Sequence, residues 1–266
     1  MVDRELALLR RIEESGNRAT AQQREVVPVG PFTALLDRST DMVWLNYAVP
    51  TGPLDDVNGV TGALQELGRV FSDRKRVLRF EFTGALWPEL PAILEQAGLH
   101  LQAAHPLMLC TPADFTPVRA PSVRVHLLRA SDDARTLATF SSVTQEGFGM
   151  VEEPAPLSQE QLDQLRRDLE GGRIRCALAW LEGEPAGAAA TMRFEDVAEL
   201  AGVATLPEKR RRGVAMSTSS VLVQDHFDRG GTVVWLSAGD AGAEAVYERI
   251  GFRVAGARLN YIADAQ

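Results

Sequence analysis

The fold of this chain is decided by one stretch, Glu199-Leu200-Ala201-Gly202-Val203-Ala204-Thr205-Leu206-Pro207-Glu208-Lys209-Arg210-Arg211-Arg212-Gly213-Val214-Ala215. Residues 199–205 are mostly small or β-branched and apolar, which predicts a strand. Pro207 has no N–H to donate to a sheet, so the strand ends near Leu206. After Gly213, apolar residues recur at helical spacing as far as Gly230. The stretch therefore predicts a strand, a basic turn and the beginning of a helix.

The basic turn and the first helical residues predict an anion site. The first N–H groups of a helix lack intrahelical partners and lie at the positive end of the helix dipole. Gly213 and Ala215 leave the backbone open to an anion, and the arginines at 210–212 add positive charge. A solvated arginine-rich surface turn is the alternative interpretation. A nucleotide P-loop is excluded, because Gly-x-x-x-x-Gly-Lys-(Ser/Thr) does not occur in the chain.

The same residues resemble a known family. Arg210-x-x-Gly213-x-Ala215 resembles the (Gln/Arg)-x-x-Gly-x-(Gly/Ala) acyl-CoA pyrophosphate loop of the GNAT superfamily of N-acyltransferases. A second block, Asp240-x-x-Ala243-x-x-Val246-Tyr247-x-x-x-Gly251-Phe252, resembles that family's Asn-x-x-Ala-x-x-Leu-Tyr-x-x-x-Gly-Phe helix and following strand. The resemblance covers residues 122–262 and implies a mixed α/β GNAT domain that uses acetyl-CoA as co-substrate.

The resemblance also implies a role for each matching residue. Pantetheine amides would pair with the backbone of the strand, and pyrophosphate would lie on the loop; the implied cofactor-binding residues are Val203, Ala204, Thr205, Arg210, Arg211, Arg212, Gly213, Val214 and Ala215. A backbone N–H near Val203 would stabilise the oxyanion. Asp240 is also assigned to the cofactor, although the family has asparagine there and a carboxylate only accepts hydrogen bonds. Met216 offers no hydroxyl to the phosphates.

Two residues are candidates for proton transfer. In the resembled family the tyrosine equivalent to Tyr247 protonates the departing thiolate; packing in the core is the alternative role. Glu199 lies where some members place a glutamate that deprotonates the acceptor amine through water, and the alternative is a solvated glutamate at the end of a strand. Weaker candidates for the base are Glu146, Glu195 and Asp196. We expect His126 to be structural.

Composition narrows the class of function. The formal net charge of -8 over 266 residues argues against a nucleic-acid partner, which needs a basic face. Cys110 and Cys176 are the only cysteines, and the four histidines lack ligand spacing, so neither a disulfide framework nor a metal site is expected. No apolar run approaches the ~20 residues that span a bilayer. We expect a cytoplasmic protein without a membrane partner.

The N-terminal half carries the same order of elements as the C-terminal half. Strands are expected at 41–49 and 77–82, helices at 55–71 and 87–97, and Leu94-Glu95-Gln96-Ala97-Gly98-Leu99 aligns with Tyr247-Glu248-Arg249-Ile250-Gly251-Phe252. Asp55 and Asp56 open the first of these helices and would repel pyrophosphate. The expected domains are a degenerate GNAT-like domain (1–110), a proline-rich linker (111–121) and a GNAT domain (122–266).

Three local expectations can be checked directly against a structure. A short amphipathic helix is expected at 3–14, followed by a polar, mobile stretch at 15–24. Ser131 is expected to cap a helix that runs to about Gln145. Ser158 and Gln161 form the pattern of a capping box.

These observations lead to one expected function and two alternatives. We expect an N-acetyltransferase in which the primary amine of a small molecule or peptide attacks the thioester directly, with a homodimer possible. One alternative is an acyl-CoA-binding sensor or scaffold without catalysis. The other is a tandem acyltransferase of small-thiol biosynthesis, resembling mycothiol synthase.

Overall fold

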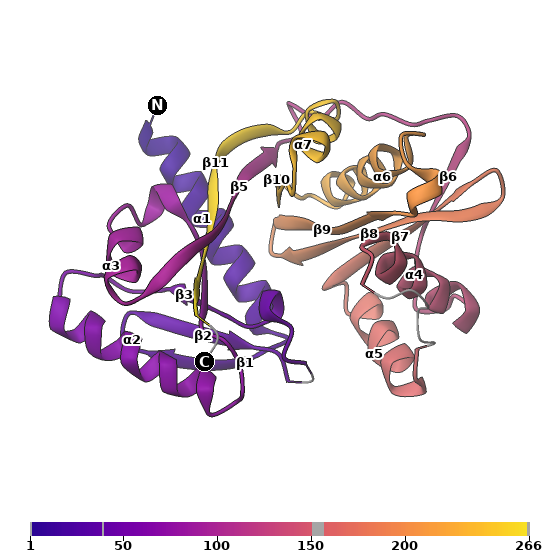
Figure 1. Ribbon diagram of the computed structural model, residues 1–266. Coiled ribbons are helices and arrows are strands. Elements are labelled where there is room, and N and C mark those ends of the chain that lie inside the picture. Colours follow the sequence, from indigo (N-terminus) through magenta and orange to yellow (C-terminus); the bar gives the residue numbers. More distant parts are fainter. Residues whose placement is uncertain (1, 39, 151–156, 265–266) are drawn as a thin grey trace. The chain divides into compact units, whose positions relative to one another are not determined.

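The computed structural model describes residues 2–38, 40–150 and 157–264. These residues form two compact units: the first contains those up to 107 together with 237–239 and 254–264, and the second contains those between 108 and 236 together with 240–253. Helices and strands alternate through both units (Figure 1), so the fold is mixed α/β as expected.

The first unit is an α/β layer built on the strand order β1-β2-β3-β4-β11-β5. Its elements are α1 (Val2–Ala21), β1 (Glu25–Val29), β2 (Phe32–Leu36), β3 (Tyr47–Pro50), α2 (Val57–Ser72), β4 (Arg79–Thr83), α3 (Leu90–Gln96), β5 (Leu99–Cys110) and β11 (Arg253–Ala263). A core of buried leucines and phenylalanines joins α2 and α3 to β2, β3 and β4. The strands β3 and β4 run parallel, with Ala48 opposite Phe80.

The second unit has the strand order β10-β9-β8-β7-β6. Its elements are β6 (Val123–Leu127), α4 (Ala134–Gly147), α5 (Gln159–Glu170), β7 (Ile174–Leu181), β8 (Glu184–Phe194), β9 (Val197–Thr205), α6 (Val214–Asp228), β10 (Val233–Ser237) and α7 (Ala241–Glu248). Figure 1 shows α6 on one face of β7–β9 and α4 with α5 on the other. Leucines of α4 and α5 pack on β7 and β8, and Val214 of α6 packs on the opposite face.

The internal repeat is visible in the order of elements. β3-α2-β4-α3-β5 in the first unit corresponds to β9-α6-β10-α7-β11 in the second part of the chain. In both copies the first two strands are parallel. Because a parallel pair needs a crossover helix, α2 and α6 occupy equivalent positions.

The compact units differ from the predicted domain limits at the C-terminus. The last strand groups with the first unit, where β11 pairs antiparallel with β4 from Arg258 opposite Thr83 to Ile262 opposite Arg79. The sequence placed residues 122–266 together because they are contiguous and carry the motif of one domain. The strand instead completes the sheet of the N-terminal unit, a pairing that local sequence does not encode.

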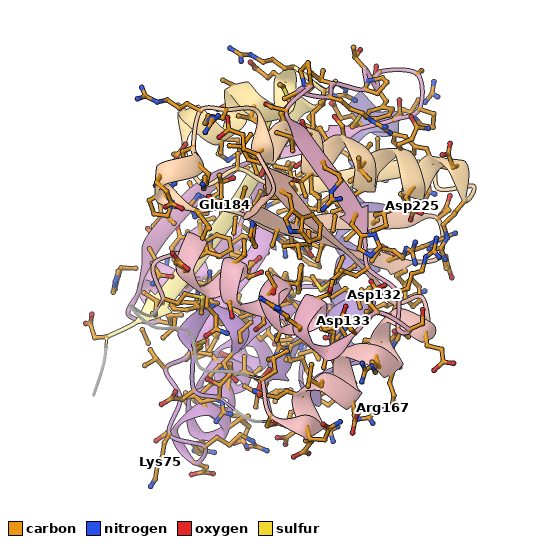
Figure 2. The ribbon with its side chains drawn as sticks, turned by 90° about the vertical axis from the view of Figure 1, so that its right-hand side faces the viewer. Lys75, Asp132, Asp133, Arg167, Glu184 and Asp225 are labelled. Atoms are coloured by element: carbon orange, nitrogen blue, oxygen red, sulfur yellow. The ribbon has the colours of Figure 1, made fainter. Side chains whose placement is uncertain are left out.

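Several local expectations were wrong. The stretch expected to be mobile after residue 14 is helical as far as Ala21, and Ser15 is buried within it. The strand expected at 41–49 is shorter, since β3 begins only at Tyr47. The hairpin β1–β2 was missed; its turn contains Gly30 at φ 55°. Asp133, and not Ser131, caps α4 by accepting from the Thr136 N–H (Figure 2).

One local expectation was confirmed at the start of α5. The capping box at Ser158 and Gln161 is present, with both reciprocal hydrogen bonds. In the described residues, no helix is long and apolar enough to cross a bilayer.

Candidate functional site

The strand β9 separates from β10 along its length. Their parallel pairing joins Val233 to Val197, Val234 to Ala198 and Trp235 to Glu199. β9 then continues to Thr205, paired on its other edge with β8 as far as Gly187. The second half of β9 therefore has an edge that β10 does not pair, as expected for the strand at 199–205.

A β-bulge interrupts β9 in this second half. On β8, Ala188 pairs with Ala204 and Ala190 pairs with Ala201. Ala189 between them therefore lies opposite two residues of β9, Gly202 and Val203. Gly202 has φ 61°, the left-handed conformation that glycine adopts without strain. An extra residue redirects the backbone N–H and C=O groups locally, so a bulge beside the separated edge offers polar groups that the ladder does not use.

The turn after β9 has the backbone of an anion site. Arg211 (φ 57°) and Gly213 (φ 80°) both adopt left-handed conformations, and Gly213 is the N-cap of α6. No side chain caps this helix, and its first intrahelical bond runs from the Ser217 N–H to the Gly213 carbonyl. The preceding N–H groups thus lie at the positive end of the helix without a side-chain acceptor.

Gly213 has no room for a side chain. A Cβ at this position would lie 2.7 Å from the Ala120 Cβ, in addition to the left-handed φ. The segment that includes Ala120 is fixed on α6, because the Val118 and Ala120 N–H groups donate to the hydroxyls of Ser220 (3.1 Å) and Ser217 (2.9 Å). The predicted linker is therefore ordered here by buried serines of α6, the helix that follows the basic turn.

Most cations of the turn already have partners in the protein. Lys209 pairs with Glu184 (Figure 2) and Arg212 with Glu182, the two carboxylates of the β7–β8 hairpin. Arg210 donates to the carbonyls of Thr205 (3.3 Å) and Gly147 (3.1 Å), so it ties the turn to the ends of β9 and α4. Within the residues that the structure describes, the exposed Arg211 side chain has no such partner.

Asp240 caps the helix that carries the candidate acid. Its Oδ1 accepts a hydrogen bond from the Ala243 N–H (2.8 Å) at the start of α7. Asparagine and aspartate are equally good N-caps, which accounts physically for a carboxylate where the resembled motif has an amide. The hydrogen bond seen for Asp240 therefore belongs to the helix.

Tyr247 projects from the last turn of α7 into a buried position. Its side chain is 8% exposed, and its ring lies 5.8 Å from that of Phe252, centroid to centroid. Burial, reinforced by the negative charge of Asp240, raises the pKa of Tyr247 to about 12. A phenol with this pKa keeps its proton at neutral pH, so Tyr247 is a proton donor there and not a base.

Glu199 lies where β9 and β10 part. It is the last residue of β9 paired with β10, and on the other edge it is opposite Met192. Directly paired residues share a face of the sheet, and so do residues two positions apart on one strand, such as Met192 and Ala190. Glu199 therefore lies on the face of the sheet where Ala190 packs against α4 and α5. The side chain is partly buried and has interactions within the protein.

The other base candidates lie elsewhere. Glu195 and Asp196 form the tight turn between β8 and β9, and Glu195 has φ 55°. The Asp196 carboxylate accepts from the Thr232 hydroxyl (2.7 Å). His126 pairs with Asp132 at 2.7 Å (Figure 2) and lies against Trp180, consistent with a structural role.

Glu146 lines an open hollow of about 710 Å³ along α4. The hollow also contains Glu184, Glu208 and Lys209. The hollow therefore adjoins the basic turn. The sequence did not predict a hollow along α4. Among the described residues, no cluster of three or more His, Cys, Asp or Glu side chains could hold a metal ion.

Sequence reasoning missed three contributors to this region. The hairpin carboxylates Glu182 and Glu184 are far in sequence from the turn that they neutralise, and Ala120 lies in a stretch that resembles a simple linker. The acidic hairpin turn and the arginine-rich turn are each visible in the sequence as charged segments, but the contact between them is not. The contact between Ala120 and Gly213 leaves no such signal.

Comparisons with known proteins agree with this geometry. Residues 139–252 match the family model described as the acetyltransferase (GNAT) family. No curated protein sequence matches the chain significantly.

Solved structures share the fold over most of the chain. A GCN5-related N-acetyltransferase from Kribbella flavida has a TM-score of 0.79 at 24% identity, over 97% of this chain and 96% of that one. Another from Sphaerobacter thermophilus has a TM-score of 0.66 at 18% identity, over 87% and 76%. A tandem GNAT protein from the clavulanic acid biosynthesis pathway has a TM-score of 0.62 at 14% identity, over 90% and 79%. The chain thus has a tandem GNAT fold.

Proposed function

Since the C-terminal region carries a domain of the acetyltransferase (GNAT) family, whose members are acyl-CoA-dependent acyltransferases, we propose that this protein transfers an acetyl group from acetyl-CoA to a primary amine. The acceptor is a small molecule or a peptide, and the location is the cytoplasm. One observation carries the proposal: the uncapped N-terminus of α6, entered through left-handed Arg211 and Gly213, directly follows the strand that separates from its parallel neighbour.

The residues of this region fit a pyrophosphate and an extended amide chain. The free N–H groups at Val214 and Ala215 supply hydrogen-bond donors, and Arg211 adds a cation without a protein partner among the described residues. Val203, Ala204 and Thr205 lie on the separated edge of β9, where backbone groups are open to pantetheine. Asp240 is left with its helix cap and, in this proposal, makes no cofactor contact.

The proposed chemistry divides among three groups of the chain. Acetyl-CoA supplies an activated acyl group. Glu199, on the α4–α5 face, accepts the proton of the acceptor amine through a water molecule. A backbone N–H at the Gly202–Val203 bulge stabilises negative charge on the carbonyl oxygen. Tyr247, protonated at neutral pH, donates its proton to the leaving thiolate.

The test of cofactor binding is a thermal shift with acetyl-CoA. One-site linkage predicts about 2.7 kcal/mol of stabilisation at a hundredfold excess over the dissociation constant. Gly213→Ala places a methyl group against Ala120 and should abolish the shift. Gly230→Ala is the matched control, because Gly230 ends the same helix at an equally left-handed φ of 79° with open space around it.

The control variant should keep the full shift. If Gly213→Ala binds acetyl-CoA as well as wild type does, the pyrophosphate assignment is wrong.

The test of catalysis is the release of coenzyme A with a panel of amines, peptides, aminoglycosides and small-thiol precursors. A protein that only binds acyl-CoA would release no thiol with any of them. The two cysteines of the protein should not react with the thiol reagent of this assay. Burial raises the pKa of Cys110 and of Cys176 to about 12, so both remain unreactive thiols.

A further inference from the structure

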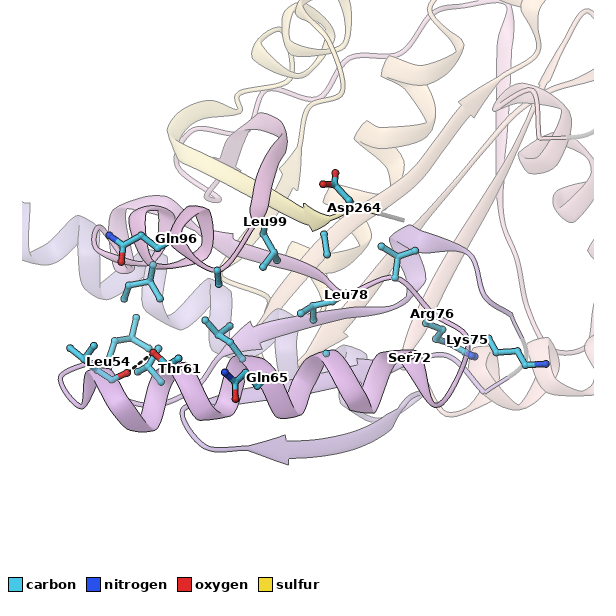
Figure 3. Close-up of a pocket in the computed structure, with 18 residues that line it drawn as sticks. Leu54, Thr61, Gln65, Ser72, Lys75, Arg76, Leu78, Gln96, Leu99 and Asp264 are labelled. Carbon is cyan, nitrogen blue, oxygen red and sulfur yellow. Dashed lines mark hydrogen bonds between the residues drawn. The ribbon is translucent and has the colours of Figure 1, made fainter. Parts of the chain in front are cut away.

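The first unit contains a groove that the proposed reaction does not use. It has a volume of about 850 Å³ and runs along α2, with α3 and the beginning of β5 opposite (Figure 3). Its volume is within the range of about 300–1,000 Å³ that is typical of small-molecule sites. All of its lining residues belong to the first unit.

The floor of the groove is aliphatic. It is formed by leucines and a valine that also belong to the core of the unit and are at most 8% exposed: Leu54, Val60, Leu64, Leu78 and Leu99. At the same end as Leu54, Val57 lines the groove with 73% of its surface exposed. An apolar occupant would cover this valine and gain about 25 cal/mol per Å² of buried apolar surface.

The charge of the groove is concentrated at its other end. Lys75 and Arg76 lie just beyond the C-terminus of α2, opposite to Leu54 (Figure 3). Arg76 donates to Asn46, Arg74 and Asp37, whereas the ammonium group of the exposed Lys75 has no hydrogen-bond or ion-pair partner among the described residues. The remaining charged residue of the lining, Asp264, lies 3.5 Å from His100. The lining is therefore net positive in a chain of net charge -8.

The N-terminus of α2 is not suited to bind phosphate. Asp56 accepts from the Gly59 N–H (3.1 Å) and occupies the helix N-terminus, with Asp55 beside it. An anion would be repelled there and attracted at Lys75. The groove thus differs from the acyl-CoA site of the C-terminal domain, although α2 and α6 are equivalent in the repeat.

We propose that this groove binds an unbranched aliphatic chain that ends in a carboxylate. The chain lies along α2 on the leucine floor, and the carboxylate meets the Lys75 ammonium group. At 1.5 Å per residue, the 16 residues of α2 are about 24 Å long, enough for a medium or long fatty acid in extended form.

Calorimetry with dodecanoate, below its aggregation concentration, tests the proposal on the full-length protein. One saturable site is expected. Gly68 lines the groove and a Cβ there meets nothing within 4 Å, so the ring of Gly68→Phe should extend into the groove and abolish binding. Gly62→Phe is the matched control on α2, since Gly62 has the same open space but does not line the groove. It should bind as wild type does.

A second pair of variants tests the carboxylate contact. Lys75→Gln should weaken dodecanoate binding about fivefold, the upper range for an exposed ion pair. Arg69→Gln removes the same charge from an exposed residue of α2 outside the groove and should change nothing. Dodecanol, with the same chain and no charge, should bind wild type more weakly than dodecanoate.

Four results would overturn the proposal: no saturable binding, equal binding by Gly68→Phe, equal affinity for dodecanol and dodecanoate, or displacement of dodecanoate by acetyl-CoA. None of them depends on acetyl transfer, so the proposal and the proposed function fail separately.

Discussion

The hydroxyl of Tyr247 has two properties that bear on its proposed role as a general acid, and its raised pKa makes it a weaker proton donor than a free tyrosine. Its ring projects from α7 and packs against that of Phe252 in a position that is 8% exposed, and burial raises the pKa of the hydroxyl to about 12. The group therefore remains protonated across the physiological range and has a fixed orientation. Both properties come from packing, and the same packing would serve a purely structural aromatic residue.

Tyr247→Phe separates these two roles, because it removes only the hydroxyl. Turnover should fall by about 10²–10⁴-fold, the usual contribution of general acid catalysis, and the loss should appear in kcat. The affinity for acetyl-CoA and the melting temperature should stay at wild-type values. An unchanged rate with an identified acceptor would make Tyr247 a core residue, and parallel loss of stability and activity would lead to the same conclusion.

At the scale of elements, α6 and its surroundings shape the proposed anion site. Ser217 and Ser220 hold the 118–120 segment on the helix, which sets the contact that excludes a side chain at residue 213. The β7–β8 hairpin opposes this site electrostatically. Its two carboxylates pair with Lys209 and Arg212 and reduce the positive potential of the turn.

The double variant Glu182→Gln, Glu184→Gln should bind acetyl-CoA about two- to fivefold more tightly at low salt, since it frees two cations for phosphate. The gain should shrink at 0.5 M salt, because screening weakens exposed charges. Equilibrium binding at two ionic strengths measures both effects. Glu66→Gln, which breaks the exposed pair with Arg69 on α2, is the control and should show neither. Weaker binding by the double variant would mean that the hairpin pairs shape the site.

At the scale of the whole molecule, buried charges tie both ends of the chain into the first unit. Arg258 on β11 pairs with Glu13 on α1 (3.2 Å) and with Glu81 on β4 (3.3 Å), and Glu81 also pairs with Arg79. Glu13 additionally accepts from the Thr83 N–H and the Trp87 Nε1–H, both at 2.6 Å. The C-terminal strand is therefore part of the N-terminal fold, and its loss should unfold that unit.

Arg258→Met should destabilise the protein by about 3–5 kcal/mol, because it leaves the buried Glu13 and the partly buried Glu81 without this partner. Urea denaturation measures the change. Arg10→Met, at an exposed arginine of α1, is the control and should cost less than about 0.5 kcal/mol. A cost for Arg258→Met equal to that of the control would show that the network does not hold the strand.

Acid should weaken the same network. Burial alone would raise the pKa of Glu81, but the charges of Arg258 and Arg79 outweigh it and lower that pKa below its ordinary value. A group with a depressed native pKa contributes stability above its unfolded pKa, about 4.3, and loses it as the pH falls through the native value. Stability should therefore drop below about pH 4.3, and Glu81→Gln should flatten this dependence in urea denaturation at several pH values.

The two units should differ in cofactor binding. Asp55 and Asp56 precede α2 at the place where the basic turn precedes α6, and their negative charges would repel pyrophosphate. Calorimetry should therefore count one acetyl-CoA per chain. Two equal sites would contradict the degenerate repeat.

Local sequence by itself determined the order of elements apart from the β1–β2 hairpin, and it determined the basic character of the turn before α6. Gly213, the three arginines before it and the apolar spacing after it act over a few residues, as do the left-handed dihedral angles of the turn and the start of the helix. The capping box at Ser158 is local as well, because it depends on residues three positions apart. The repeat could be predicted because each of its elements has its own local pattern.

Tertiary structure alone decided the features that join residues far apart in the sequence. The pairing of β11 with β4, the contact of Ala120 with Gly213 and the neutralisation of Lys209 by Glu184 each depend on where the chain returns in space. Many partners satisfy the same strand edge or the same charge, so a local pattern does not select among them. Only the simultaneous packing of all elements in a unit makes that selection, because burial rewards one arrangement over the others.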